Sequence, residues 1–278
     1  MYEIFSDIVI YVLFYTYLKF FNNYCELLRK RLTEIEIINY VTFAMWVLEI
    51  YQSKQGEGLW TGKYSIFVRT LGCALRCRYC DTPYAQQDRT ENENEEDGIG
   101  ANLSAEEIVG RILLLELPHV VITGGEPMQS PEIVELTRLL KDFDYQITIE
   151  TSGIVDVPVL CDLMSISPKL SNSTPLKAGR DIAHEQNRFR PEVVQSLMLR
   201  YNYQLKFVVD TPNDLNEIEE YLKRFQGVVS ERVLLMPQAI DARTMTEKAS
   251  WIIPFCEQRG YQYCPRMQII WYGNKRRT

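Results

Sequence analysis

Three closely spaced cysteines, Cys73, Cys77 and Cys80, constrain this 278-residue chain more than any other feature, because their C-x3-C-x2-C spacing puts them in one short loop. Three thiolates can hold three irons of a four-iron four-sulfur cluster, which usually takes four cysteines. The fourth iron is then open to bind another molecule. A structural zinc site is the alternative, but such sites usually pair C-x2-C with a second C-x2-C or an H-x3-H. The sequence has neither second pair and only two histidines, so the spacing favours a cluster.

The residues on either side of this loop extend the pattern. Residues 55–58 read Gln-Gly-Glu-Gly, residues 65–69 form a short apolar segment, and Asp81-Thr82 follows the last cysteine directly. With Tyr79 just before that cysteine, the loop resembles the signature of radical S-adenosylmethionine (SAM) enzymes. Together these features resemble, more narrowly, the 7-carboxy-7-deazaguanine synthase family of queuosine and deazapurine biosynthesis. The resemblance extends from Met45 to the C-terminus.

The resemblance implies a chemistry. The expected cofactors are a four-iron four-sulfur cluster, SAM and Mg²⁺. The open iron is expected to bind the amino and carboxylate groups of SAM, and an electron from the cluster to cleave SAM to a 5′-deoxyadenosyl radical. That radical is expected to take a hydrogen atom from 6-carboxy-5,6,7,8-tetrahydropterin, which becomes 7-carboxy-7-deazaguanine with loss of ammonia. The cofactor supplies this chemistry, and the protein binds and orients the substrate.

Composition narrows the class of partner and the compartment. A formal net charge of −7 argues against binding of bulk nucleic acid, whose phosphates favour a basic surface. The count of seven cysteines is odd, whereas a secreted disulfide scaffold is smaller and evenly paired. We therefore expect a cytoplasmic protein with a small-molecule substrate. The resemblance implies that this substrate is a pterin. A flavodoxin or similar electron donor and a homodimer are the expected protein partners.

Strands alternate with helices from Val47 onward, which predicts a mainly parallel α/β sheet. Ser104 and Glu107 form a capping box at the start of one helix, and later helices are expected near 191–199, 215–225 and 244–258. Six core strands are too few for a closed eight-stranded barrel, so an open partial (β/α)6-type barrel is expected, as in radical SAM enzymes. The six strands are predicted at 65–69, 119–123, 146–150, 163–166, 205–209 and 233–236.

Two segments do not fit this alternation. Residues 88–98 are strongly acidic and almost without apolar side chains, which predicts a solvated, mobile loop.

Residues 1–44 form an N-terminal extension, expected to be helical, ahead of a core domain at 45–278. The apolar run within 8–15 is bracketed by Asp7 and Lys19, and it is shorter than the roughly 20 residues of a membrane span. Two interpretations stay open: an over-extended reading frame with Met45 as the true start, or a membrane-associated helix.

Ligands of barrel-like α/β folds bind at the carboxyl ends of the strands, so the residues that follow each strand are candidates for the site. Gly125 follows one strand within Gly-Gly-Glu-Pro, where the missing Cβ is expected to let a ligand approach the backbone. The resemblance implies that Gly125 contacts the amino group of SAM and that residues 150–153 lie near the SAM ribose. It also implies that Lys169 binds the SAM carboxylate, although a lone lysine is more often a solvated loop residue. The full set of predicted SAM contacts is Tyr79, Cys80, Asp81, Gly125, Ser167, Pro168, Lys169, Met236, Pro237, Gln238 and Ala239.

Substrate and magnesium contacts are also implied by the resemblance. Arg69 ends a predicted strand, and its planar fork suits a carboxylate, although a surface salt bridge is the alternative. Thr82 is assigned to Mg²⁺, which prefers oxygen ligands; capping of a turn is the alternative. The predicted substrate contacts are Lys54, Gln55, Gly56, Arg69 and Thr123.

Two other functions remain open from the residues alone. A radical SAM activase of a glycyl-radical enzyme carries the same cysteine spacing. A non-catalytic metal-binding module would bind zinc, would not bind SAM and would be colourless. The Gln-Gly-Glu-Gly run at 55–58 and the Cys-Asp-Thr sequence favour the synthase over the activase. The visible absorbance of anaerobically purified protein would separate both enzymes from the metal-binding module.

Overall fold

The computed structural model describes residues 44–86, 100–176, 179–273 and 275–277. Contacts divide the chain into two units, Met1–Thr42 and Phe43–Thr278, and the described residues all belong to the second. The predicted helical extension and the acidic run at 88–98 therefore lie outside the described residues. Within the described ranges, no helix combines the length and the apolar character that crossing a membrane requires.

One open sheet of nine strands forms the centre of the second unit, in the order β3-β1-β2-β4-β5-β6-β7-β8-β9. The strands are β1 Met45–Lys54, β2 Tyr64–Thr70, β3 Ala101–Leu103, β4 His119–Gly124, β5 Gln146–Thr151, β6 Leu163–Ile166, β7 Tyr203–Val209, β8 Val233–Pro237 and β9 Gln262–Tyr263. The six predicted core strands are β2 and β4 to β8, and they run parallel. β1 pairs antiparallel with β2 and β3. The prediction of an open partial barrel is confirmed.

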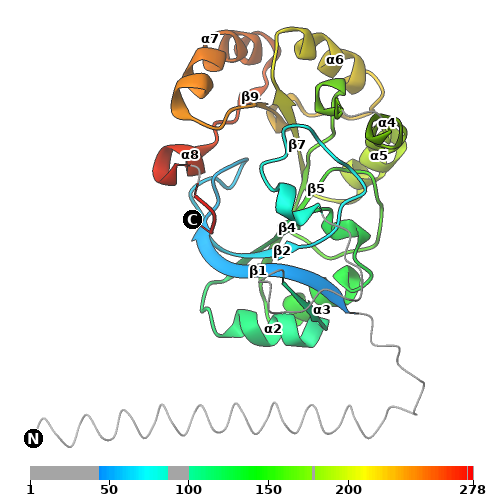
Figure 1. Cartoon of the computed structure of the whole chain (residues 1–278), viewed down its shortest axis with the longest axis vertical. Coiled ribbons are helices and arrows are strands. Elements are labelled where there is room, and N and C mark those ends of the chain that lie inside the picture. Colours follow the sequence, from blue (N-terminus) through cyan, green and yellow to red (C-terminus); the bar gives the residue numbers. More distant parts are fainter. Residues whose placement is uncertain (1–43, 87–99, 177–178, 274, 278) are drawn as a thin grey trace, which may run out of the picture. The chain divides into compact units, whose positions relative to one another are not determined.

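The helices follow the strands and pack on the outer side of the sheet, while α8 and the C-terminus lie beside the hairpin of β1 and β2 (Figure 1). The helices are α2 Ala105–Leu113, α3 Ile133–Asp142, α4 Arg180–Arg188, α5 Pro191–Arg200, α6 Asn213–Leu222, α7 Ala242–Arg259 and α8 Met267–Tyr272. The capping box is confirmed: Ser104 Oγ accepts the Glu107 N–H at 3.3 Å, and the Glu107 carboxylate accepts the Ser104 N–H at 2.8 Å. Helix α6 ends three residues before its predicted end at Phe225.

Successive side chains of each strand point to opposite faces of the sheet, and here the outer face is apolar and the inner face is polar. In β2, Ile66 and Val68 are fully buried in the hydrophobic core, whereas Phe67 and Arg69 point into a pocket on the other face. Thr123 of β4 lines the same pocket. The fold thus delivers polar side chains to the inner face.

His119 lies outside this pocket, at the amino end of β4. It is fully buried, and its ring nitrogens bond Ser65 Oγ at 2.7 Å and Thr148 Oγ1 at 2.9 Å. Burial lowers the pKa of His119 to about 4, so the ring is neutral at ordinary pH. These bonds join β2, β4 and β5, which gives the histidine a structural role.

Candidate active site

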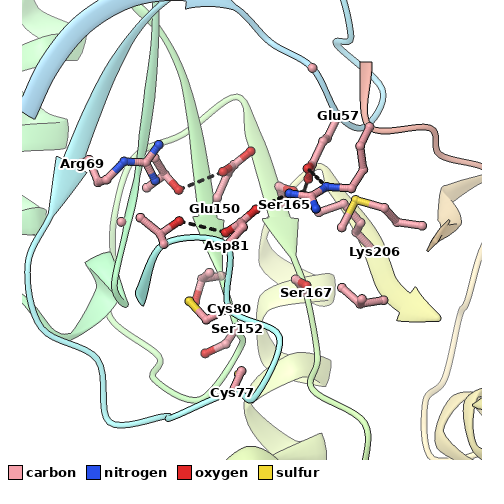
Figure 2. Close-up of a pocket in the computed structure, with 18 of the residues that line it drawn as sticks. Glu57, Arg69, Cys77, Cys80, Asp81, Glu150, Ser152, Ser165, Ser167 and Lys206 are labelled. Atoms are coloured by element: carbon pink, nitrogen blue, oxygen red, sulfur yellow. Dashed lines mark hydrogen bonds and ion pairs between the residues drawn. The ribbon is translucent and has the colours of Figure 1, made fainter. Parts of the chain in front are cut away.

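A pocket opens at the carboxyl ends of the parallel strands, and Figure 2 shows side chains from several strands and loops converging on it. Nearly all residues predicted to touch a ligand line it. These are Lys54, Gln55, Gly56, Arg69, Cys73, Cys77, Tyr79, Cys80, Asp81, Thr82, Thr123, Gly125, Ser167, Lys169, Met236, Pro237 and Gln238. Pro168 and Ala239 are buried and do not line the pocket, so their side chains do not reach a ligand in it.

The three cysteines of the loop are free thiols that line this pocket together. Burial raises the pKa of Cys73 to about 12 and that of Cys80 to about 11, so the thiolates need a bound cation to form. In the described ranges, no three His, Cys, Asp or Glu side chains converge closely enough to hold one metal ion. Cysteine thiolates are the usual protein ligands of a four-iron four-sulfur cluster, and three of them line this pocket together. The loop therefore fits a cluster.

Two glycines at the end of β4 pack closely, Gly124 against the end of β2 and Gly125 against the start of the cysteine loop. A Cβ on Gly125 would lie 1.9 Å from the carbonyl oxygen of Gly72, and Gly124 has φ +135° with Thr70 backbone at 2.3 Å from its missing Cβ. The Gly125 N–H donates to the Thr70 carbonyl at 3.0 Å. Protein backbone thus fills the space that a Cβ on Gly125 would need, and close packing is the physical reason for glycine here, while Gly125 still lines the pocket.

Glu126, next in this turn, is a buried carboxylate that the sequence analysis did not assign. It accepts hydrogen bonds from Thr151 Oγ1 at 2.7 Å, from the Ser152 N–H at 2.8 Å and from Ser152 Oγ at 2.5 Å. A further bond comes from the Met128 N–H at 3.2 Å. Because these partners follow β5 and its own turn follows β4, Glu126 fixes two neighbouring loops of the pocket to each other.

Glu150 connects two residues predicted to bind substrate. Its carboxylate accepts Gln55 Nε2 at 3.0 Å and Thr123 Oγ1 at 2.8 Å. These partners lie on the hairpin after β1 and at the end of β4, while Glu150 belongs to β5. Its contacts place Glu150 among the predicted substrate residues, although the sequence assigned residues 150–153 to the SAM ribose.

Arg69 makes a salt bridge and also lines the pocket. Its Nε lies 2.8 Å from Glu49 Oε1, and its Nη2 donates to the Tyr51 hydroxyl at 3.0 Å. The second oxygen of the buried Glu49 accepts Arg276 and Arg277, each at 2.9 Å. Three guanidinium groups therefore share one carboxylate, and the excess positive charge at this rim suits an anionic ligand.

A buried ionic group, here called the Glu57 cluster, consists of Glu57, Lys206, Arg266 and Gln268. Glu57 lies 2.5 Å from Lys206 Nζ and 3.1 Å from Arg266 Nε, and it accepts Gln268 Nε2 at 2.6 Å. Burial alone would raise the pKa of Glu57, but the two cations outweigh it and hold that pKa well below its usual value. Lys206, Arg266 and Gln268 were not among the predicted site residues.

Thr82 is buried beside the last cysteine, and its hydroxyl donates to Asp81 Oδ1 at 2.8 Å. It precedes the short helix η1, Pro83–Ala85, without capping it through its side chain. Thr82 does lie at the cap position of this turn, and its backbone carbonyl, rather than its side chain, accepts the Ala85 N–H at 2.9 Å. The Thr82 hydroxyl and the Asp81 carboxylate together present oxygen atoms of the kind that Mg²⁺ prefers.

Lys169 and Tyr79 are held in place at the end of the pocket that is predicted to bind SAM. Lys169 Nζ donates to the Ser167 carbonyl at 2.9 Å and to Ser167 Oγ at 2.8 Å, so it is not a solvated loop lysine. The Tyr79 hydroxyl donates to Asn172 Oδ1 at 3.1 Å, and its ring packs against the small apolar cluster that includes Met236. Both side chains have fixed positions before any ligand arrives.

The chain is similar in sequence and in fold to known proteins. The model of the Radical SAM superfamily matches residues 67–250. A 7-carboxy-7-deazaguanine synthase of Rhodopirellula baltica is 39% identical over 239 residues, covering 84% of this chain and 89% of the relative. One from Halobacterium salinarum is 32% identical over 248 residues, covering 84% and 93%. The crystal structure of QueE from Escherichia coli has the same fold, with a TM-score of 0.63 at 22% identity over 84% of this chain and all of that one.

Proposed function

The chain belongs to the 7-carboxy-7-deazaguanine synthase family of the radical SAM superfamily, and we propose that it converts 6-carboxy-5,6,7,8-tetrahydropterin to 7-carboxy-7-deazaguanine with loss of ammonia. It is a radical SAM enzyme, and the proposed reaction is a carbon–nitrogen lyase reaction. One observation carries the proposal: the cysteine loop and the residues expected to bind the pterin line one pocket.

Each group of residues has a role in this proposal. Cys73, Cys77 and Cys80 hold the cluster, which together with SAM supplies the 5′-deoxyadenosyl radical when both are bound. Lys169 places a positive charge where the SAM carboxylate binds. The carboxylate of the pterin binds at the rim near Arg69, where cations are in excess.

Glu150 is the residue around which the pterin ring is bound in this proposal. Its carboxylate already holds Gln55 and Thr123 by hydrogen bonds, so all three side chains are oriented before the substrate enters. Pre-oriented polar groups reduce the entropy lost when a substrate is fixed for reaction. These residues hold the pterin and exclude water while the hydrogen atom is removed.

The test is anaerobic reconstitution with iron and sulfide, followed by incubation with SAM, a reductant and the carboxypterin. We expect mass spectrometry to detect 7-carboxy-7-deazaguanine and 5′-deoxyadenosine. Release of 5′-deoxyadenosine with a partner glycine-radical protein, and none with the pterin, would support the activase instead. The family relatives, matched over 84% of the chain, do not favour that alternative.

Thr82→Ala is expected to lower turnover by at least about tenfold and to remove its stimulation by Mg²⁺, because the change deletes one of few protein oxygens available to the ion. The cluster and SAM binding remain, since the cysteines are unchanged. Thr246→Ala is the matched control: its hydroxyl bonds the Ala242 carbonyl at 2.9 Å on exposed α7. Turnover measured with and without Mg²⁺ checks this, and an unchanged Mg²⁺ response in Thr82→Ala would remove Thr82 from the metal site.

We also propose that residues 45–278 form the complete catalytic domain, working in the cytoplasm as a homodimer with a flavodoxin-like electron donor. Deleting residues 1–44 is expected to leave folding, iron uptake and turnover unchanged, because β1 begins at Met45 and every predicted site residue follows it. Circular dichroism, iron content and turnover of the truncated protein check this. Loss of folding or iron uptake would contradict it, whereas membrane association of the full chain alone would favour the membrane-associated helix.

A further inference from the structure

The guanidinium of Arg266 contacts three separate segments of the pocket. Its Nε lies 3.1 Å from Glu57 in the hairpin between β1 and β2, and its Nη1 donates to the Ala239 carbonyl at 2.7 Å, just after β8. Its Nη2 forms an ion pair with Asp81, between the last cysteine and Thr82. The Arg266 side chain is only 10% exposed and that of Glu57 is also largely buried, so the bond between them is shielded from water, whereas the Asp81 side chain is half-exposed.

Each of these segments has a different task in the proposed function. The hairpin carries the predicted pterin contacts Gln55 and Gly56, the segment after β8 carries predicted SAM contacts, and Asp81 lies in the loop that holds the cluster. A second contact continues the chain of bonds: Asp81 uses its other oxygen to accept the Thr82 hydroxyl at 2.8 Å. Through Asp81, Arg266 therefore also helps to fix the Thr82 hydroxyl, which is the oxygen assigned to Mg²⁺.

We propose that Arg266 is a positioning residue that fixes the cluster loop relative to the substrate hairpin and the SAM segment. The inference rests on the proposed function. A planar guanidinium with donors on three sides can serve three acceptors at once, whereas a lysine ammonium is a point charge that does not match this fork.

The partners of the two carboxylates separate this role from a general contribution to stability. Glu57 keeps Lys206 at 2.5 Å and Gln268 at 2.6 Å when Arg266 is removed, and Figure 2 shows Glu57 and Lys206 at one side of the pocket. In the part of the chain that the structure describes, Asp81 has Arg266 and the Thr82 hydroxyl as partners. Loss of Arg266 therefore releases chiefly the cluster loop.

The experiment measures iron content and the dissociation constant of SAM in reconstituted Arg266→Gln, Arg266→Lys, Asp81→Asn and the double variant Arg266→Gln/Asp81→Asn. Iron content should stay at the level of the parent protein. SAM binding should weaken about tenfold in both Arg266 variants, the size of a lost hydrogen bond to a charged group. The double variant should bind SAM no more weakly than the weaker single variant, because both changes break the same Arg266–Asp81 ion pair. Arg138→Gln, which removes a guanidinium bonded within α3, should bind SAM like the parent.

Additive losses in the double variant, or parental SAM affinity in Arg266→Lys, would overturn the proposal. Asp81 is half-exposed, so Asp81→Asn should fold even if an Arg266 variant does not. If Asp81→Asn binds SAM as tightly as the parent protein, the proposal is also overturned. SAM binding is measured without the pterin, so this result is independent of the reaction. If the parent protein cleaves SAM but makes no deazaguanine acid, the proposed function fails. The SAM dissociation constants of the single and double variants still decide the role of Arg266 in that case.

Discussion

Replacing any one of Cys73, Cys77 and Cys80 with alanine is expected to abolish cluster binding and to reduce product formation to the detection limit. The cluster has only three protein thiolates in this loop, so one lost ligand leaves a second iron unprotected. The other cysteines in the described part of the chain, Cys161, Cys256 and Cys264, do not line the pocket. They cannot replace the missing ligand without rearrangement of the core.

Iron and sulfide per chain, together with the visible absorbance after anaerobic reconstitution, measure this effect before any activity assay. Cys161→Ala is the matched control, because Cys161 is a half-buried free thiol outside the pocket. It should take up the cluster as the parent protein does. A full four-iron cluster with turnover in any of the three loop variants would show that the substituted cysteine is not a ligand.

Glu57→Gln is expected to lower the free energy of unfolding by about 3–5 kcal/mol, because it leaves the buried cations Lys206 and Arg266 without their shared carboxylate. The two cations keep the pKa of Glu57 well below its usual value of 4.5. A carboxylate with a lowered pKa stabilises the fold fully above its unfolded pKa and loses that contribution as pH falls toward the folded pKa. The difference between parent and variant should therefore be largest above pH 4.5 and shrink in more acidic solution.

Urea unfolding of the cluster-free proteins across this pH range measures the effect. Glu247→Gln removes the carboxylate of an exposed pair with Arg243 and should change stability by less than about 1 kcal/mol. If Glu57→Gln lowers the free energy of unfolding as little as Glu247→Gln does, the Glu57 cluster is not a buried ionic network in solution. Equal losses at all pH values would contradict the lowered pKa.

The central sheet was predictable because its strands are short apolar runs followed by glycine, cysteine or polar residues. β7 is buried along its whole length, as a strand covered on both faces should be. The sequence did not predict β3 and β9, which have three and two residues and too little pattern to detect. It also missed α4, whose sequence is dominated by charged and amide side chains.

The site divides in the same way. Residues within the cysteine motif and just after the strands were found, because their local pattern is distinctive. Lys206 and Arg266 were missed, since they meet Glu57 across 149 and 209 residues of sequence and no local pattern reports such a pairing. Lys206 did offer one signal: it is a lysine inside a mainly apolar strand, where a buried charge needs a partner.

The most direct test of the account follows one hydrogen atom. The carboxypterin labelled with deuterium at C6 would be incubated with the reconstituted protein, SAM and reductant, and the 5′-deoxyadenosine would be analysed by mass spectrometry. If the pocket holds the pterin for radical chemistry at C6, the 5′-deoxyadenosine gains one deuterium and 7-carboxy-7-deazaguanine forms alongside it. Unlabelled 5′-deoxyadenosine, with no deazaguanine acid, would contradict the assignment of this pocket to the pterin.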